Sequence, residues 1–144
     1  MSHPPSQIIQ ASLIAGGVGT EPTANAAWPV FVSHLPSTIG NALCVYDTAG
    51  KRDGRLMAGA TIKHPGIQIR CRAVDYPTGY AKMKEVEAHL DAVLRENVAL
   101  DARTYTIAAV TQTGDILTLG REPDEKARES FTLNGTTTIK DTTP

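Results

Sequence analysis

Histidine and cysteine are among the side chains of this sequence that could act in catalysis or hold a metal ion. The four histidines are scattered over an expected tail, loops and a solvated helix face: His3, His34, His64 and His89. The sequence has no Gly-x-Ser-x-Gly elbow, no His-Glu-x-x-His motif and no close pair of cysteines, which are spacings that build nucleophile or zinc sites. We therefore expect no catalytic residue, no metal and no cofactor.

The two cysteines both lie inside apolar, strand-like segments. Cys71 alternates with Ile67 and Ile69, so its side chain is expected to point into the core. A nucleophilic Cys71 would instead need an open, electropositive setting and a nearby histidine. Two cysteines are also too few for a disulfide framework, and we expect Cys44 and Cys71 to be reduced core residues.

A glycine-rich segment, GGVGT at residues 16 to 20, could in principle cradle a phosphate. Phosphate-binding loops run from a strand into a helix and continue with lysine and then serine or threonine. Here the glycines follow an expected helix and lead into proline-containing coil, and no Lys-Ser or Lys-Thr follows Gly19. A glycine helix stop with a flexible exit is the better interpretation.

Charged residues are distributed unevenly along the chain. Six basic residues lie between residues 51 and 72: Lys51, Arg52, Arg55, Lys63, Arg70 and Arg72. Acidic residues are concentrated in the last third, and four of them are site candidates: Glu122, Asp124, Glu125 and Glu129. Opposite charges steer association and fix its register, so we expect contacts between copies of the chain or with a partner. The alternative is an ordinary basic loop and a solvated strand face.

Regular alternation of side chains predicts the elements that position these charges. In the strand around residues 67 to 73, the apolar residues face the core, which leaves Arg70 and Arg72 on the outward face. Residues 49 to 64 are rich in glycine and basic residues and are expected to form a flexible exposed loop or a β-arm. The other predicted elements are helices at 5–15 and 77–95, an edge strand or extended segment at 28–36, strands at 41–48, 103–111, 115–119 and 128–140, and a frayed tail at 141–144.

Local signals mark where these elements begin and how they pack. Ser6 is a candidate cap for the first helix, and Asp75 precedes the second. The second helix is expected to expose a polar face formed by Lys82, Lys84, Glu85, His89 and Asp91. A turn at Thr113-Gly114 is expected to join the two strands on either side of it. Together these elements predict an α+β fold, a mostly antiparallel sheet with the helices packed on one face.

Length and composition describe one ordinary globular domain over residues 1–144. The chain has 41% hydrophobic and 20% charged residues and a net charge of −1, which argues against a dedicated nucleic-acid binder. The N-terminus has neither a basic region nor a long apolar run. We therefore expect no secretory signal, no membrane span and folding in a cytoplasm.

Six blocks of sequence follow one another from about Trp28 to Ile139: WPVFVSHLP, NALCVYDTAGKRDGRLMAG, HPGIQIRCRAVDYPTGYAK, TYTI, GDILTLG and FTLN. Together they resemble the minor capsid protein family of tailed bacteriophages. That family is similar to the tail terminator, or tail completion, proteins of long non-contractile tails.

The resemblance implies a structural protein without catalysis. Tail terminators form a ring, typically hexameric, at the head-proximal end of the tail tube, stop its polymerisation and present the surface that docks to the head connector. The implied partners are other copies of the chain, the tail tube protein and a head connector or stopper protein, with non-specific proximity to genomic DNA in the lumen. The implied location is the tail or neck of the virion, after assembly in the bacterial host cytoplasm.

Other interpretations stay open at this point. Another head-tail neck protein, such as a connector stopper or adaptor, would share these sequence features. A nucleic-acid-binding module would place the basic residues against phosphates, but no aromatic residue alternates with Arg70 and Arg72. An enzyme is disfavoured because no acid, base and nucleophile form a set.

Overall fold

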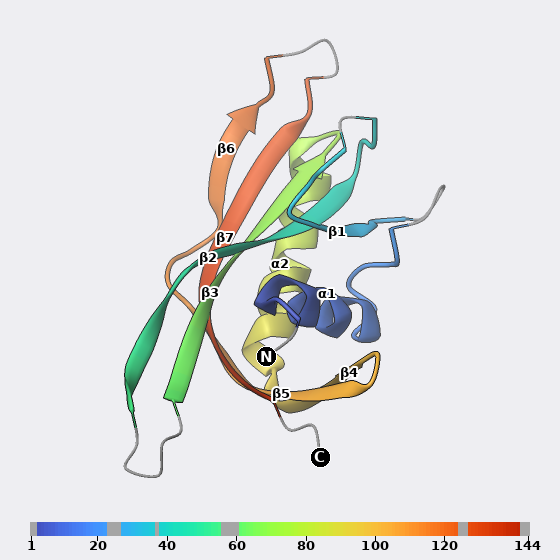
Figure 1. Cartoon of the computed structure of the whole chain (residues 1–144). Coiled ribbons are helices and arrows are strands. Elements are labelled where there is room, and N and C mark those ends of the chain that lie inside the picture. Colours follow the sequence, from blue (N-terminus) through green and yellow to red (C-terminus); the bar gives the residue numbers. More distant parts are fainter. Residues whose placement is uncertain (1–2, 23–26, 37, 56–60, 124–126, 142–144) are drawn as a thin grey trace.

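The computed structural model of the chain describes residues 3–22, 27–36, 38–55, 61–123 and 127–141, with the backbone alone at 52–55 and 61–63. These residues form a mixed, broadly α+β structure of two helices and a curled seven-stranded sheet (Figure 1). The elements, in chain order, are α1 (Pro5–Ala15), β1 (Val30–Val32), β2 (Ala42–Arg55), β3 (Thr61–Ala73), α2 (Tyr76–Ala92), β4 (Leu94–Leu100), β5 (Arg103–Gln112), β6 (Leu117–Arg121) and β7 (Glu129–Asp141).

The sheet has the strand order β1-β2-β3-β7-β5-β4, and β6 pairs with β7 off this path. β1 runs parallel to β2, whereas the other pairings of the named strands are antiparallel. The predicted edge strand at 28–36 is confirmed as β1, although it is shorter than expected. Asp141, expected in a frayed tail, is instead the last residue of β7, and its carboxylate accepts a hydrogen bond from Arg103 (2.7 Å). The rest of that tail lies outside the described residues.

β5 and β6 lie one after the other along the same edge of β7. β5 pairs with Gly135 to Asp141, and β6 pairs with Glu129 to Thr132. The chain between them therefore does not reverse at the predicted turn, and the Thr113 amide donates to the carbonyl of Asn134 (3.1 Å). The turn prediction was wrong because a Thr-Gly pair permits a bend without setting its angle.

Helix α1 begins at Pro5, with Pro4 as its N-cap. Proline suits the first turn of a helix because the amide hydrogen it lacks would have no partner there. The prediction that Ser6 caps this helix was wrong, because Ser6 lies inside the first turn. Its amide and hydroxyl donate to the Asp47 carboxylate of β2 (2.9 and 2.7 Å). Ile9 and Leu13, which lie one turn apart on α1, are both fully buried.

Helix α2 begins as predicted but ends early. The Asp75 carboxylate accepts a hydrogen bond from the Thr78 amide (2.8 Å). Hydrogen bonding by the Thr78 side chain, and then by this amide, lowers the pKa of Asp75. The helix stops at Ala92, where Val93 adopts an extended conformation. β4 then begins at Leu94 and pairs with β5. The prediction missed this strand because Val93 and Leu94 also continue the helical spacing of apolar residues.

The predicted polar face of α2 is only partly solvated. Lys82 is largely buried, its Nζ donates to the carbonyl of Val18 (2.9 Å), and it lies 5.2 Å from the centre of the Trp28 ring. His89 is half-buried, and its Nε2 lies 2.9 Å from the Ser12 hydroxyl. The prediction of solvent exposure was wrong for these two residues because α1 and the segment after it cover this side of α2.

One continuous hydrophobic core lies between the helices and the concave side of the sheet (Figure 1). The strand residues predicted to face inward, among them Ile67, Ile69 and Cys71, are confirmed as members of this core. The helices contribute apolar residues at one-turn spacings: Ile9 and Leu13 from α1, and Met83, Val86 and Leu90 from α2.

β2 and β3 form a long hairpin that extends beyond the helices (Figure 1). Their backbone pairing continues to Arg55 opposite Thr61, with shifts of register after Thr48 and after Arg52. Paired strands are thus present at 49–55 and 61–64, within the segment predicted as a loop or β-arm. Residues 56–60 lie outside the described residues, and the flexibility of the segment stays a prediction.

Candidate partner interface

The first group of predicted site residues lies on the β2–β3 hairpin. The register places Arg52 opposite Lys63 and brings Lys51 and Arg55 onto the same pair of strands. Lys51 is exposed, whereas the side chains at positions 52, 55 and 63 lie outside the described part of the chain. Antiparallel pairing therefore concentrates four basic residues on one projecting element.

The second group, Arg70 and Arg72, lies on the outer face of β3, opposite the core. The register places Arg70 between Cys44 of β2 and Thr132 of β7. Arg70 is half-buried, and its Nε is inaccessible to solvent without a hydrogen-bond partner among the described residues. Because the subunit itself encloses that nitrogen, a partner can contact only the solvent-exposed part of the Arg70 side chain.

Arg72 is not exposed, contrary to the prediction that it faces solvent. It is 4% exposed, and its guanidinium donates to the backbone carbonyls of Pro36 and Ile39. Arg128, which the sequence analysis missed, is 3% exposed and donates to the same Ile39 carbonyl (2.7 Å). Two buried arginines therefore fix the segment after β1 against the outer face. The only sequence signal for Arg128 is its position directly before an alternating strand.

The described acidic candidates have arginine partners within the subunit. The Glu122 carboxylate lies 3.3 Å from Arg128 Nη2, and the Glu129 carboxylate lies 3.3 Å from Arg121 Nε. Asp124 and Glu125 lie outside the described residues. Contacts of these four acids with another copy stay a prediction.

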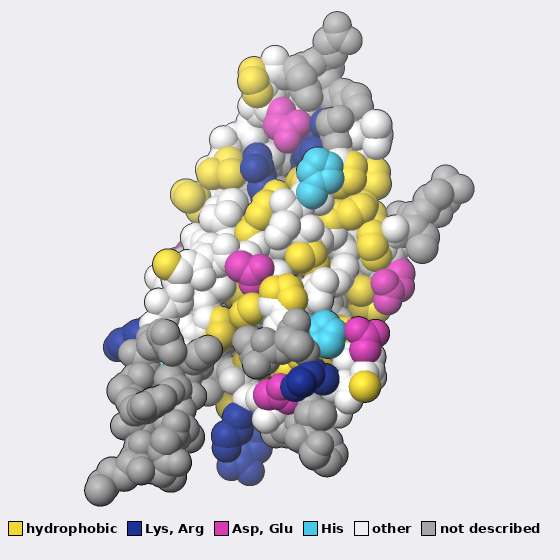
Figure 2. Space-filling model, viewed as in Figure 1, with side chains coloured by type: hydrophobic (Ala, Val, Ile, Leu, Met, Phe, Trp, Pro, Cys, Tyr) yellow, Lys and Arg dark blue, Asp and Glu magenta, His cyan; other side chains and the backbone are white. Residues whose placement is uncertain are grey.

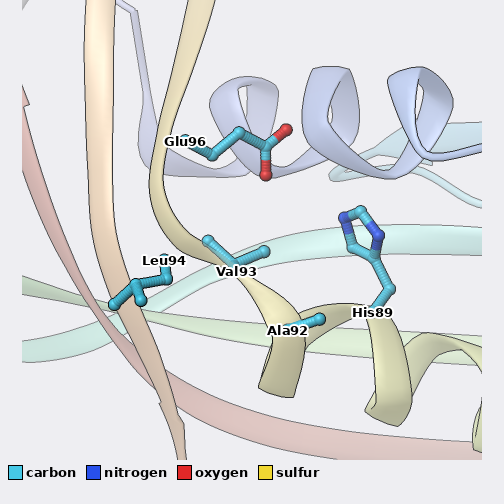
Figure 3. A pocket seen from close by; sticks show the side chains of 5 residues that line it. All are labelled: His89, Ala92, Val93, Leu94 and Glu96. Carbon is cyan, nitrogen blue, oxygen red and sulfur yellow. The ribbon is translucent and has the colours of Figure 1, made fainter.

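A serine, a histidine and a glutamate meet where α1 lies against the end of α2. Ser12 Oγ lies 2.9 Å from His89 Nε2 and donates to Glu96 Oε2 (2.8 Å). Ser12 is fully buried, and its one hydroxyl hydrogen is directed to Glu96, so His89 does not serve it as a base. These bonds attach α1 to α2 and β4. Figure 3 shows the hollow beside them, about 300 Å³ in volume and lined by His89, Ala92, Val93, Leu94 and Glu96.

The other histidines make separate polar contacts. His3 Nδ1 lies 2.7 Å from the Tyr105 hydroxyl, and His64 Nδ1 lies 3.0 Å from the Thr138 hydroxyl. His34 is exposed. Within the described ranges, no three histidine, cysteine or acidic side chains gather as metal ligands. No helix in the described part of the chain is long and apolar enough to cross a membrane.

The predicted placement of both cysteines as buried free thiols is confirmed. Cys71 packs in the core, where burial raises its pKa to about 12. Cys44 lies on the opposite face of the sheet, and burial raises its pKa as well. The reactive form of cysteine is the thiolate, so neither thiol is ionised near neutral pH.

We expect neither cysteine to react with iodoacetamide in the folded protein at about pH 8. In guanidinium chloride both thiols lose their burial, their pKa values return to the ordinary range, and two adducts should form. Intact-mass spectrometry counts the adducts. Rapid modification of Cys71 without denaturant would contradict its place in the core.

The described residues thus form a basic hairpin at one end of the subunit and an arginine-bearing outer face of the sheet. A family model described as bacteriophage tail terminator protein matches residues 12–141. The chain belongs to the bacteriophage tail terminator family, which confirms the kinship expected from the sequence blocks, and it is a structural protein of a phage tail. No curated protein matches the chain.

Proposed function

We propose that this chain forms a closed ring of six copies at the head-proximal end of a phage tail tube. The ring stops polymerisation of the tube and presents the surface to which the head connector docks. The family match over residues 12–141 carries this proposal. A net charge of −1 supports it, because nearly neutral copies can pack side by side without strong mutual repulsion.

Mass photometry and electron microscopy of the purified protein, alone and mixed with tail tube protein, test the proposal. We expect closed rings in at least one of the two samples, and tubes that stop growing where a ring is attached. Monomers alone in both samples would contradict ring formation. Antibody labelling of virions locates the protein: a label at the tail end supports a terminator, and a label on the connector side supports a stopper or adaptor.

The proposed contacts with neighbouring copies or neck partners are the basic hairpin residues and Arg70. The hairpin set is Lys51, Arg52, Arg55 and Lys63, and the proposed counterparts on the partner are Glu122, Asp124, Glu125 and Glu129. Arg70 is the member of this set on the outer face of β3, where its side chain is half-buried and partly open to a partner. Arg72 lies inside the subunit, where its guanidinium donates to the carbonyls of Pro36 and Ile39.

Replacing Arg70 with glutamate should impair ring formation while leaving the subunit folded. The free energy of unfolding should change by less than about 1 kcal/mol, since few contacts of the subunit are lost. Association should weaken by about 2 to 5 kcal/mol, the usual cost of removing one partner of a desolvated charge pair. Urea denaturation and mass photometry measure the two effects separately.

Lys84→Glu is the matched control, because it makes the same change of charge on the exposed side of α2. It should leave rings intact. If Arg70→Glu also yields normal rings and infectious particles, Arg70 is only part of a solvated face.

A further inference from the structure

Residues 33–36 and 38–41, between β1 and β2, lie across the outer face of the sheet, and we call them the strap. Figure 1 shows the strap at the same end of the molecule as the end of β6 and the start of β7. None of its residues is buried, and Ser33 has a left-handed backbone with a φ of 62°, which is unfavourable for a residue with a side chain. Segments with few buried apolar contacts open locally at a low cost in free energy.

Two buried guanidinium groups clamp the strap through one backbone oxygen. The carbonyl of Ile39 accepts hydrogen bonds from Arg72 and from Arg128, and these arginines are 4% and 3% exposed. Two cations beside one acceptor repel each other, and the repulsion is strongest where water is excluded. The clamp therefore depends on negative charge close to it.

Glu122, which follows β6, supplies such a charge. Its Oε2 lies 3.3 Å from Arg128 Nη2, and its Oε1 accepts from the Ser130 hydroxyl at 3.4 Å. Both distances are long for contacts to a carboxylate, and the Glu122 side chain is 20% exposed. Figure 2 shows acidic and basic side chains close together at this end of the molecule. A cation from outside the subunit can therefore share this carboxylate and weaken its contact with Arg128.

We propose that the strap opens separately from the core, and that the ion pair between Glu122 and Arg128 keeps it closed. A cation that takes Glu122 leaves Arg72 and Arg128 facing each other, and the strap opens to relieve their repulsion. The cation that fits is a lysine or arginine from the hairpin of a neighbouring copy. This identity rests on the proposed function, in which Glu122 is one of the partner acids. The strap thus links a contact between copies to the shape of the outer face.

Cys44 is a natural reporter of the strap. It is fully buried although it lies on the outer face, and the backbone of Ser33 and His34 hydrogen-bonds to its thiol. Cys71 lies on the other face of the sheet, in the core. Opening of the strap should therefore expose Cys44 to a thiol reagent and leave Cys71 protected.

Alkylation of the unassembled protein by iodoacetamide, followed for each cysteine by peptide mass spectrometry, tests the clamp. Glu122→Gln should raise the rate at Cys44 about tenfold or more, since a hydrogen-bonded charge loses its counter-ion, with no change at Cys71. Glu129→Gln is the matched control, because it removes the same charge from a nearby acid whose partner, Arg121, is 70% exposed. The control should leave both rates as in the parent protein.

A double-mutant cycle tests whether Glu122 acts through Arg128. Arg128→Met removes one of the two like charges and keeps a long side chain. In that background, Glu122→Gln should change the rate at Cys44 less than about twofold. An additive increase would mean that Glu122 holds the strap in another way and would overturn the proposal. A parental rate in Glu122→Gln would overturn it too, as would equally raised rates at Cys44 and Cys71, which indicate opening of the whole subunit.

Rings test the role of the neighbouring copy. Cys44 should be alkylated faster in rings than in the unassembled protein, because a cation of the neighbour shares Glu122. Equal or slower alkylation in rings would overturn release by a neighbour, while the ring itself would stand. If no rings form with or without tail tube protein, the proposed function fails, and the results with Glu122→Gln and Arg128→Met still decide whether the ion pair controls the strap.

Discussion

Replacing Arg72 with glutamate should lower the free energy of unfolding by about 3 to 5 kcal/mol, the range found when a buried charge loses its compensation. Arg72 is 4% exposed and donates to the carbonyls of Pro36 and Ile39. The change removes both donors and directs a carboxylate toward two carbonyl oxygens. Urea denaturation should therefore show a much lower midpoint than in the parent protein.

Arg70→Glu is the control, because it makes the same change two residues away on the same face of β3. Its midpoint should stay close to that of the parent. Equal urea midpoints for the two variants would show that the hydrogen bonds from Arg72 to Pro36 and Ile39 do not stabilise the fold. A double change at both positions would unfold the subunit, so the proposed role of Arg70 in assembly has to be tested by a single change.

Phe131→Ala should also cost about 3 to 5 kcal/mol of folding free energy, as large-to-small changes of buried aromatic residues do. Phe131 is fully buried on β7, beneath Tyr76 and Tyr80. Its ring lies directly against the backbone of Gly79 in α2, where an added Cβ would come within 2.4 Å of Phe131 Cε2. Thermal or urea unfolding measures the loss.

A double-mutant cycle with Gly79 checks that this close contact is the cause. Gly79→Ala alone should destabilise by about 1 to 3 kcal/mol through overpacking. In the Phe131→Ala background the added methyl group meets less resistance, so the same change should cost clearly less. Additive losses would contradict direct packing of Gly79 on the Phe131 ring.

Local patterns predicted the parts of the fold that depend on neighbours in sequence. Alternation identified Ile67, Ile69 and Cys71 as core residues, and the position of Asp75 predicted the start of α2. The end of α2 was missed because Val93 and Leu94 satisfy a helical and an extended pattern equally well. In the structure only Val93 is buried, and Leu94 begins an edge strand.

The candidate interface was predicted less completely because it depends on what covers each face. Alternation correctly placed Arg70 and Arg72 on the outer side of β3. It contains no information about Pro36, more than thirty residues earlier in the chain, whose carbonyl accepts a hydrogen bond from Arg72. In the same way, the hollow at β4 lies where the chain passes from the end of α2 into β4. Such surfaces arise from tertiary contacts, which a single sequence does not display.

β7 follows the other named strands in the chain, yet it lies in the middle of the sheet and separates β3 from β5. Until its residues leave the ribosome, the strands before α2 and those after it have no ladder to join them. Pairing between distant segments is also slow compared with local contacts. A chain that is cut before β7 thus lacks the pairing that joins the two halves of the described sheet.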